Sequence, residues 1–113
     1  MPKNTMSKMP NGIGRKSYND YVNHMVKFFL SCLDGLTVAG HSPADIQNWL
    51  AVQQVWSDLS DGNKELLQMI YGSKRPYRDS VDMYAAAHSM TSDSVWWIVT
   101  DICAKIAKAR GLV

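Results

Sequence analysis

The chain has 113 residues, of which 46% are hydrophobic and 19% charged, so we expect one globular domain with its own hydrophobic core. The longest apolar runs, VWWIV and VKFFL, are far shorter than the roughly 20 residues of a transmembrane helix, and the polar N-terminus lacks the apolar stretch of a signal peptide, so we expect a cytoplasmic protein without a membrane partner. The net charge of +2 is too small by itself to indicate a nucleic-acid partner.

The N-terminal third is predicted to contain an arm and one helix. Residues 1–16, MPKNTMSKMPNGIGRK, have no apolar period and predict a flexible basic arm, which leaves residues 17–113 as the helical domain. From Ser17 to Leu33, apolar residues recur at helical spacing. Ser17 and Asp20 resemble a capping box, and Asp34-Gly35 is expected to end this helix.

The middle of the chain predicts two helices. In SPAD, Ser42 is a good N-cap, Pro43 suits the first helical position and Asp45 suits the first turn. This helix should run to about Leu59, after which residues 60–63 open a short third helix ending in KELLQMIY. The expected broad apolar face of the second helix comprises Ile46, Trp49, Val52, Trp56 and Leu59.

The C-terminal part predicts two more helices joined by a tight turn at Ser89-Met90. Asp79 and Asp82 look like the cap of a fourth helix, VDMYAAAH. Thr91 should cap a long last helix that runs to about Ala109 and is closed by Gly111. Because no segment alternates as a strand does, the predicted fold is all-α, with about five helices in one domain.

Catalytic and metal motifs are missing from the sequence. His24, His41 and His88 have no partners at metal-ligand spacing, and Cys32 and Cys103 have no metal or redox spacing. Two such cysteines most often act as small buried hydrophobic residues, which suits a reducing cytoplasm. No Gly-rich phosphate loop or nucleophile elbow is found. We therefore expect neither an enzyme nor a cofactor.

The segment at about 79–110 has the order of a helix-turn-helix. The small Ala85 would let a second helix cross closely, a tight turn follows, and Val95 and Ile98 would hold the second helix down. The alternative is an ordinary helical hairpin within a bundle.

From about Asp45 to Val113 the chain resembles the sigma-factor region-four helix-turn-helix, in the form of the small ArpU- and RinA-type regulators of phages and mobile elements. The matching pieces, in order, are LSDGNKELLQMIYG, YAAAHSMTSDSVWWIV and IAKARGLV. Membership would imply binding to double-stranded DNA and control of transcription, with RNA polymerase as a partner for the acidic middle of the chain.

In this hypothesis the helix that begins at Thr91 enters the major groove of the DNA. Its outward residues would be Ser92, Asp93, Ser94, Trp97, Thr100 and Asp101. Side chains that read bases by bidentate contacts, namely Arg, Lys, Asn and Gln, are missing from that face, and an aspartate there would repel phosphate. His88 also stands before the turn, where an apolar residue is usual.

Cations near the motif are expected to contact phosphates. Lys74, Arg75 and Arg78 precede or open the first helix of the motif, where the DNA backbone passes in this docking geometry. Lys105, on the last helix, is also expected to contact DNA. Lys108 and Arg110 are explained by the helix dipole alone.

The adjacent tryptophans cannot share one face of a helix, because each residue turns the chain by about 100°. Trp96 is expected at the edge of the core, whereas Trp97 lies away from the stripe that Val95 and Ile98 define. Three roles remain open for Trp97: burial beneath the N-terminal helix, contact with DNA, or an anchor in a protein interface. The corresponding alternative functions are a homodimerising interaction module that does not read DNA and a small packaging-type subunit.

Overall fold

A computed structural model of the protein describes residues 17–37 and 39–113, so the predicted basic arm, residues 1–16, lies outside the described residues. The described residues form five α-helices and no strand, which confirms the all-α prediction. The helices are α1 (Asn19–Ser31), α2 (Pro43–Trp56), α3 (Asp61–Tyr71), α4 (Tyr77–Ala87) and α5 (Ser92–Arg110).

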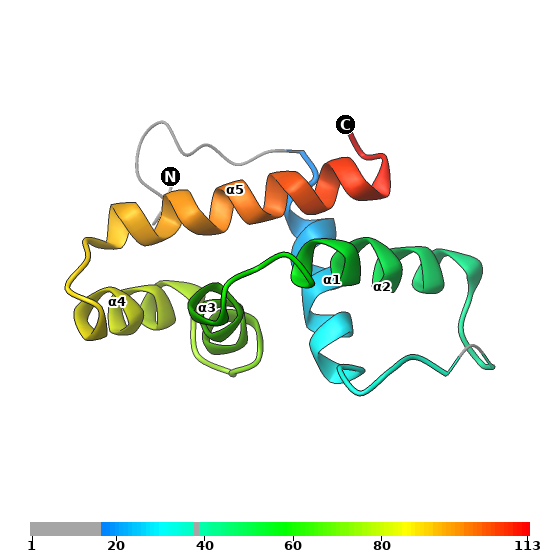
Figure 1. Cartoon of the computed structure of the whole chain (residues 1–113), viewed down its shortest axis with the longest axis horizontal. Helices are drawn as coiled ribbons and strands as arrows, with labels where there is room; N and C mark the ends of the chain where they lie inside the picture. The colour runs from blue at the N-terminus through cyan, green and yellow to red at the C-terminus, as the bar shows by residue number, and fades with distance from the viewer. Residues whose placement is uncertain (1–16, 38) are drawn as a thin grey trace.

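The longest helix, α5, spans the molecule and packs against α1, α2 and α4 (Figure 1). In this view α4 lies beneath the N-terminal half of α5, α2 lies beneath its C-terminal half, and α3 is seen end-on between them. Within the described part of the chain, no helix is both long enough and apolar enough to cross a membrane.

The core is built around α1, which lies outside the part of the chain that carries the resemblance. Four residues of α1 are buried at the spacing of one helix face, and they share a single core cluster with residues of the other four helices. The buried residues of α1 are Val22, Met25, Val26 and Phe29. A hydrogen bond adds to this packing, because the Tyr71 hydroxyl of α3 donates to Oδ1 of Asn23 over 2.8 Å.

The predicted N-caps Ser42 and Thr91 are confirmed by their hydrogen bonds, and Ser60 caps α3 in the same way. Ser42 Oγ accepts from the backbone N–H of Asp45, and Ser60 Oγ accepts from that of Asn63, both over 3.1 Å. Thr91 caps α5 in the same way, as described below. At the other end of α5, Gly111 adopts a left-handed conformation with φ of 84°, as expected for a helix terminator.

Two predicted caps are wrong. The residue before α1 is Tyr18, whose side chain makes no capping hydrogen bond, so Ser17 and Asp20 do not form a capping box. The helix α4 begins at Tyr77, directly after Pro76, so Asp79 lies in its first turn and Asp82 lies in its middle. Proline has no N–H and an extended ψ of 143° here, which sets the start of α4 four residues earlier than the acidic pattern suggested.

The predicted apolar face of α2 is also partly wrong. The helix ends at Trp56, and the residues buried on it are Asn48, Ala51, Val52 and Val55. Trp49 and Trp56 lie at the edge of the core, where each packs its ring on Phe29, with centroids 5.3 and 5.4 Å apart. Small residues face inward because α2 is packed between α1 and α5, and the large rings fill the margins of that contact.

Candidate nucleic-acid interface

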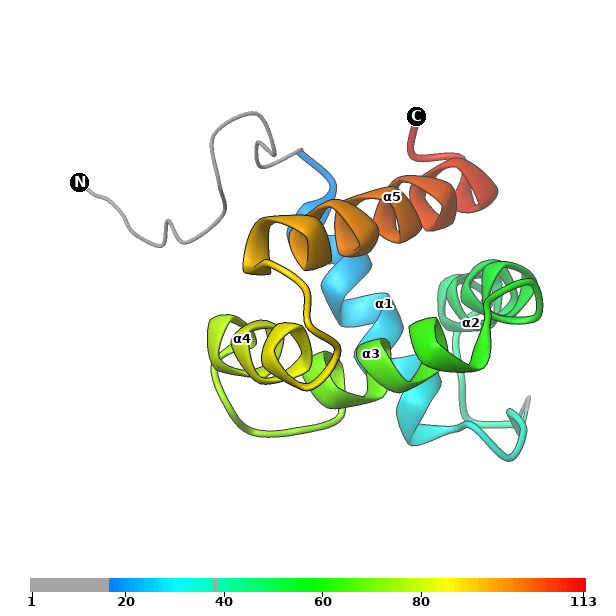
Figure 2. The ribbon, with the colours of Figure 1, turned by 60° about the vertical axis from the view of Figure 1, so that its left-hand side comes forward.

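The turn between α4 and α5 is tight, as predicted. Ser89 adopts a left-handed conformation with φ of 55°, and the N–H of Met90 donates to the carbonyl oxygen of Ala85 over 2.8 Å. This six-residue closure is the one that commonly ends a helix and reverses the chain. Figure 2 views α4 nearly along its axis and α5 from the side, so the two helices cross.

The packing inside this α4–α5 hairpin follows the sequence pattern closely. Ala85 and Val95 are buried, and Ile98 is half-buried against the core. His88 does not take the place of the missing apolar residue, because it is exposed and stacks on the ring of Tyr84 with centroids 4.0 Å apart. Tyr84 is buried instead, and its hydroxyl donates to the carbonyl oxygen of Gly62 over 3.2 Å.

The hydroxyl groups at the start of α5 are engaged within the hairpin. Thr91 Oγ1 accepts from the N–H of Ser94 over 3.1 Å and donates to Ser94 Oγ over 2.9 Å. Ser92 Oγ donates to Oδ1 of Asp82 on α4 over 2.5 Å, a bond to a charged acceptor that fixes α5 to α4. Thr91 and Ser92, both predicted to face DNA, therefore have structural partners, and Asp93 remains as the exposed polar residue of the first turn.

The two tryptophans are separated as the helix geometry requires. Trp96 is buried, with 6% of its surface exposed, whereas 52% of the surface of Trp97 is exposed. The reading in which the N-terminal helix covers Trp97 is therefore wrong. The helix α1 packs on the opposite, buried stripe of α5, which includes Val99, Ile102 and Ile106.

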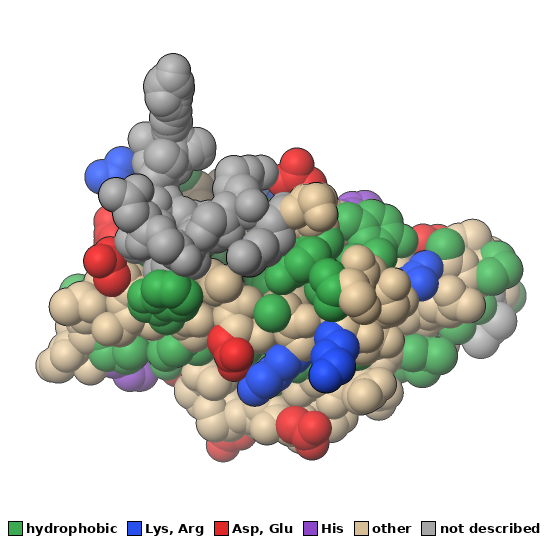
Figure 3. Space-filling view, turned by 90° about the horizontal axis from the view of Figure 1, so that it is seen from above, with side chains coloured by type: hydrophobic (Ala, Val, Ile, Leu, Met, Phe, Trp, Pro, Cys, Tyr) green, Lys and Arg blue, Asp and Glu red, His purple; other side chains and the backbone are tan. Residues whose placement is uncertain are grey.

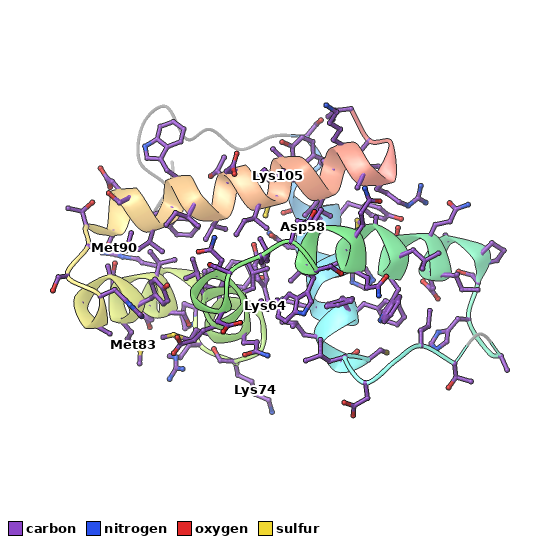
Figure 4. All side chains as sticks on the ribbon, viewed as in Figure 1. Asp58, Lys64, Lys74, Met83, Met90 and Lys105 are labelled. Carbon is purple, nitrogen blue, oxygen red and sulfur yellow. The ribbon has the colours of Figure 1, made fainter. Side chains whose placement is uncertain are left out.

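The candidate phosphate contacts do not all lie on one surface. Lys74, Arg75 and Arg78 are exposed, in the loop before α4 and in its first turn. In Figures 1 and 2 this loop lies below α4 and the N-terminal end of α5 lies above it, so α4 separates the two. In Figure 4, Lys74 lies at the lower edge, whereas Lys105 lies on α5 at the upper side. Lys105 also pairs with Asp101 over 3.1 Å, so the structure groups it apart from the loop cations.

The face seen from above α5 carries no continuous basic stripe. Where grey atoms do not cover it in Figure 3, the few Lys and Arg side chains are interspersed with acidic and hydrophobic ones. Towards the C-terminal end of α5, a groove of about 490 Å³ lies between α2 and α5 and is lined by Asp58, Lys105 and Lys108, among others.

Sequence reasoning missed a polar network that joins three helices. Asn48 is 4% exposed, donates from Nδ2 to the Tyr21 hydroxyl over 2.9 Å, and accepts at Oδ1 from Arg110 Nε over 2.6 Å. The helix dipole therefore accounts for only part of the role of Arg110, which also satisfies a buried amide. The one indication of this network in the sequence is Asn48, a polar residue at a position of α2 that faces the core.

Tyr71 and Cys103 are buried side by side, and burial favours the uncharged form of each. Burial raises the pKa of the Tyr71 hydroxyl well above its usual value, and burial raises the pKa of the Cys103 thiol to about 11. The two groups lie 3.6 Å apart, between α3 and α5. Among the described residues, no group of three or more His, Cys, Asp or Glu side chains is placed to hold a metal ion.

Comparison with protein-family models, with curated proteins and with solved structures finds no match to this chain.

Proposed function

We propose that the protein is a DNA-binding transcriptional regulator that docks on double-stranded DNA through the α4–α5 hairpin. The observation that carries the proposal is the position of Lys74, Arg75 and Arg78. These exposed cations lie in the loop that leads into the first helix of the hairpin and in the first turn of that helix. The resemblance of the sequence to sigma region four, in its ArpU and RinA form, supports the same assignment. This regulator acts by binding and has no catalytic role.

The contacts proposed for this surface are mainly with phosphates. Phosphate contacts from Lys and Arg position a protein on DNA, whereas sequence is read by side chains that reach base edges. The hydroxyls of Thr91 and Ser92 are already bonded within the hairpin, so Asp93 and Trp97 are left for the bases. Neither makes the bidentate contacts of Arg or Asn, so we expect modest discrimination between DNA sequences. The acidic segment of residues 28–70 is the proposed contact for RNA polymerase.

The test is fluorescence anisotropy of a labelled duplex titrated with the full chain at about 50 and about 200 mM salt. Changing Arg75 and Arg78 together to Ala should remove two phosphate contacts. The logarithmic salt slope should then fall by about 1.8, and affinity at about 0.1 M salt should drop on the order of 50-fold. A matched control changes Lys105 and Lys108 to Ala, which removes the same charge from the C-terminal half of α5 and should leave binding nearly unchanged. Equal effects of the two double variants would show that the loop cations have no special role.

A second candidate function rests on the exposure of Trp97. A tryptophan with 52% of its surface exposed is a favoured anchor for a protein interface, and a second copy of this chain is its proposed partner. Sedimentation equilibrium should then show a homodimer that Trp97→Ser converts to a monomer, with little dependence on salt. A wild-type chain that stays monomeric at every concentration tested would exclude this candidate.

A further inference from the structure

We infer that Lys27, on α1, belongs to the same phosphate-binding surface as Lys74, Arg75 and Arg78, so that α1 takes part in DNA contact. We name these four residues the basic loop surface. The inference rests on the proposed function, and it adds a residue from a helix that the sequence resemblance does not include. It also gives the partner a definite chemistry, the sugar–phosphate backbone of a duplex.

The side chain of Lys27 lies over the ring of Tyr77, the first residue of α4. Its Nζ lies 5.1 Å from the ring centroid of Tyr77, the residue that precedes Arg78. Tyr77 also contacts Tyr71, in an edge-on arrangement with ring centroids 5.0 Å apart. Lys27 itself is exposed. The buried tyrosine thus fixes the ring, and the ring holds a lysine of α1 beside the basic turn that begins α4.

The cations of the basic loop surface are not used in ion pairs within the described part of the chain. The nearest acid along α4 is Asp79, which lies in the first turn, where it is favoured by the helix dipole. The aromatic contact of Lys27 uses the ring face and leaves ammonium N–H groups that can donate to an oxyanion.

A duplex backbone fits this surface better than a single small anion does. The four cations come from α1, from the loop before α4 and from the first turn of α4, and they are all exposed, which suits a polyanion with many phosphates more than one small anion. Contact by all four would give a salt slope of about −3.6, since each neutralised phosphate contributes about −0.9.

Lys27→Gln tests the inference, because glutamine keeps part of the side chain over Tyr77 while it removes the charge. Lys64→Gln is the matched control: Lys64 Nζ also lies over an aromatic ring, at 5.8 Å from the centroid of Trp56, but it belongs to α3, in the acidic middle of the chain (Figure 4). Both variants and the wild-type chain are titrated against a mixed-sequence labelled duplex over the same salt range.

Lys27→Gln should lower the magnitude of the salt slope by about 0.9 and weaken binding about eightfold at 0.1 M salt, whereas Lys64→Gln should change neither. Lys27→Arg should restore both values, which a role confined to packing on Tyr77 would not require. If Lys27→Gln matches Lys64→Gln while the Arg75 and Arg78 double variant still loses binding, the inference is wrong and the proposed function stands. If the wild-type chain shows no salt-sensitive binding, both are wrong.

Discussion

Asp93 is the residue that most opposes DNA contact on the proposed interface. It is exposed in the first turn of α5, where its charge favours the helix dipole, and the hydroxyls beside it are already bonded within the hairpin. A carboxylate at this position repels phosphate, so the structure combines a stabilising role in the helix with an unfavourable role at the interface. This conflict makes Asp93 informative about function.

Asp93→Asn should therefore strengthen binding to mixed-sequence duplex about two- to fivefold at low salt, because one repulsive charge is removed. The gain should fade as salt rises. Anisotropy titrations measure it, and Asp101→Asn, which removes a charge already paired with Lys105, is the control. A loss of affinity would instead mean that the Asp93 carboxylate accepts a hydrogen bond from a base, as acids do from the amino group of cytosine.

At the scale of the elements, helix ends are predicted correctly from the sequence where the residues that form them are neighbours in the chain. Ser42 and Thr91 were predicted as caps correctly, because a cap and its N–H lie within three residues of each other. The prediction of a helix cap at Asp79 and Asp82 is wrong, because Pro76 fixes the start of α4 more strongly than an acidic residue does. The order of helix, tight turn and helix in the α4–α5 hairpin is likewise a local feature. Which residues of α2 are buried depends on its packing against α1 and α5, and the spacing of apolar residues does not show it.

The turn between α4 and α5 gives a prediction at this scale. Ser89 has φ of 55°, a conformation that costs an L-residue roughly 1 kcal/mol and costs glycine little. Ser89→Gly should raise the free energy of unfolding by up to about 1 kcal/mol, offset in part by the greater entropy of glycine in the unfolded chain. Ser89→Val should lower the free energy of unfolding by more than about 1 kcal/mol, because a β-branched residue tolerates the left-handed backbone conformation poorly. Urea unfolding measures both, and destabilisation by glycine would mean that the serine side chain contributes to the turn.

At the scale of the whole molecule, α5 joins two parts with different tasks. Its N-terminal half lies over α4 and forms the proposed interface, whereas its C-terminal half lies over α2 and is tied to it by Arg110 and Asn48 (Figure 1). The contacts that unite the molecule, Arg110 with Asn48 and Tyr71 with Asn23, join residues 62 and 48 positions apart. Pairs so distant in the chain have no signature in a single sequence, which is why the helices were predicted but their assembly was not.

The Tyr71–Cys103 contact lies where α3 and α5 meet in the core. Ionisation of either side chain is therefore coupled to unfolding of the whole domain. The folded pKa of Cys103 is about 11, against an ordinary 9.0, so above pH 9 the unfolded chain loses a proton that the folded chain keeps. The contribution of Cys103 to the free energy of unfolding is therefore constant below pH 9. It falls as the pH rises from 9 to 11, and the loss is about 1–2 kcal/mol at pH 10.5. Tyr71, whose pKa is also raised by burial, adds to the loss from about pH 10 upward.

Urea unfolding of the wild-type chain at pH 8 and at pH 10.5 measures this loss, and Cys103→Ala separates its sources. Alanine leaves a small cavity that costs stability equally at both pH values, but it removes the thiol that ionises. The difference in stability between the two pH values should therefore shrink in the variant by about 1–2 kcal/mol, and adding Tyr71→Phe should reduce it further. An unchanged difference in Cys103→Ala would mean that the thiol ionises as readily in the folded chain as in the unfolded one, and hence that water reaches the contact between α3 and α5.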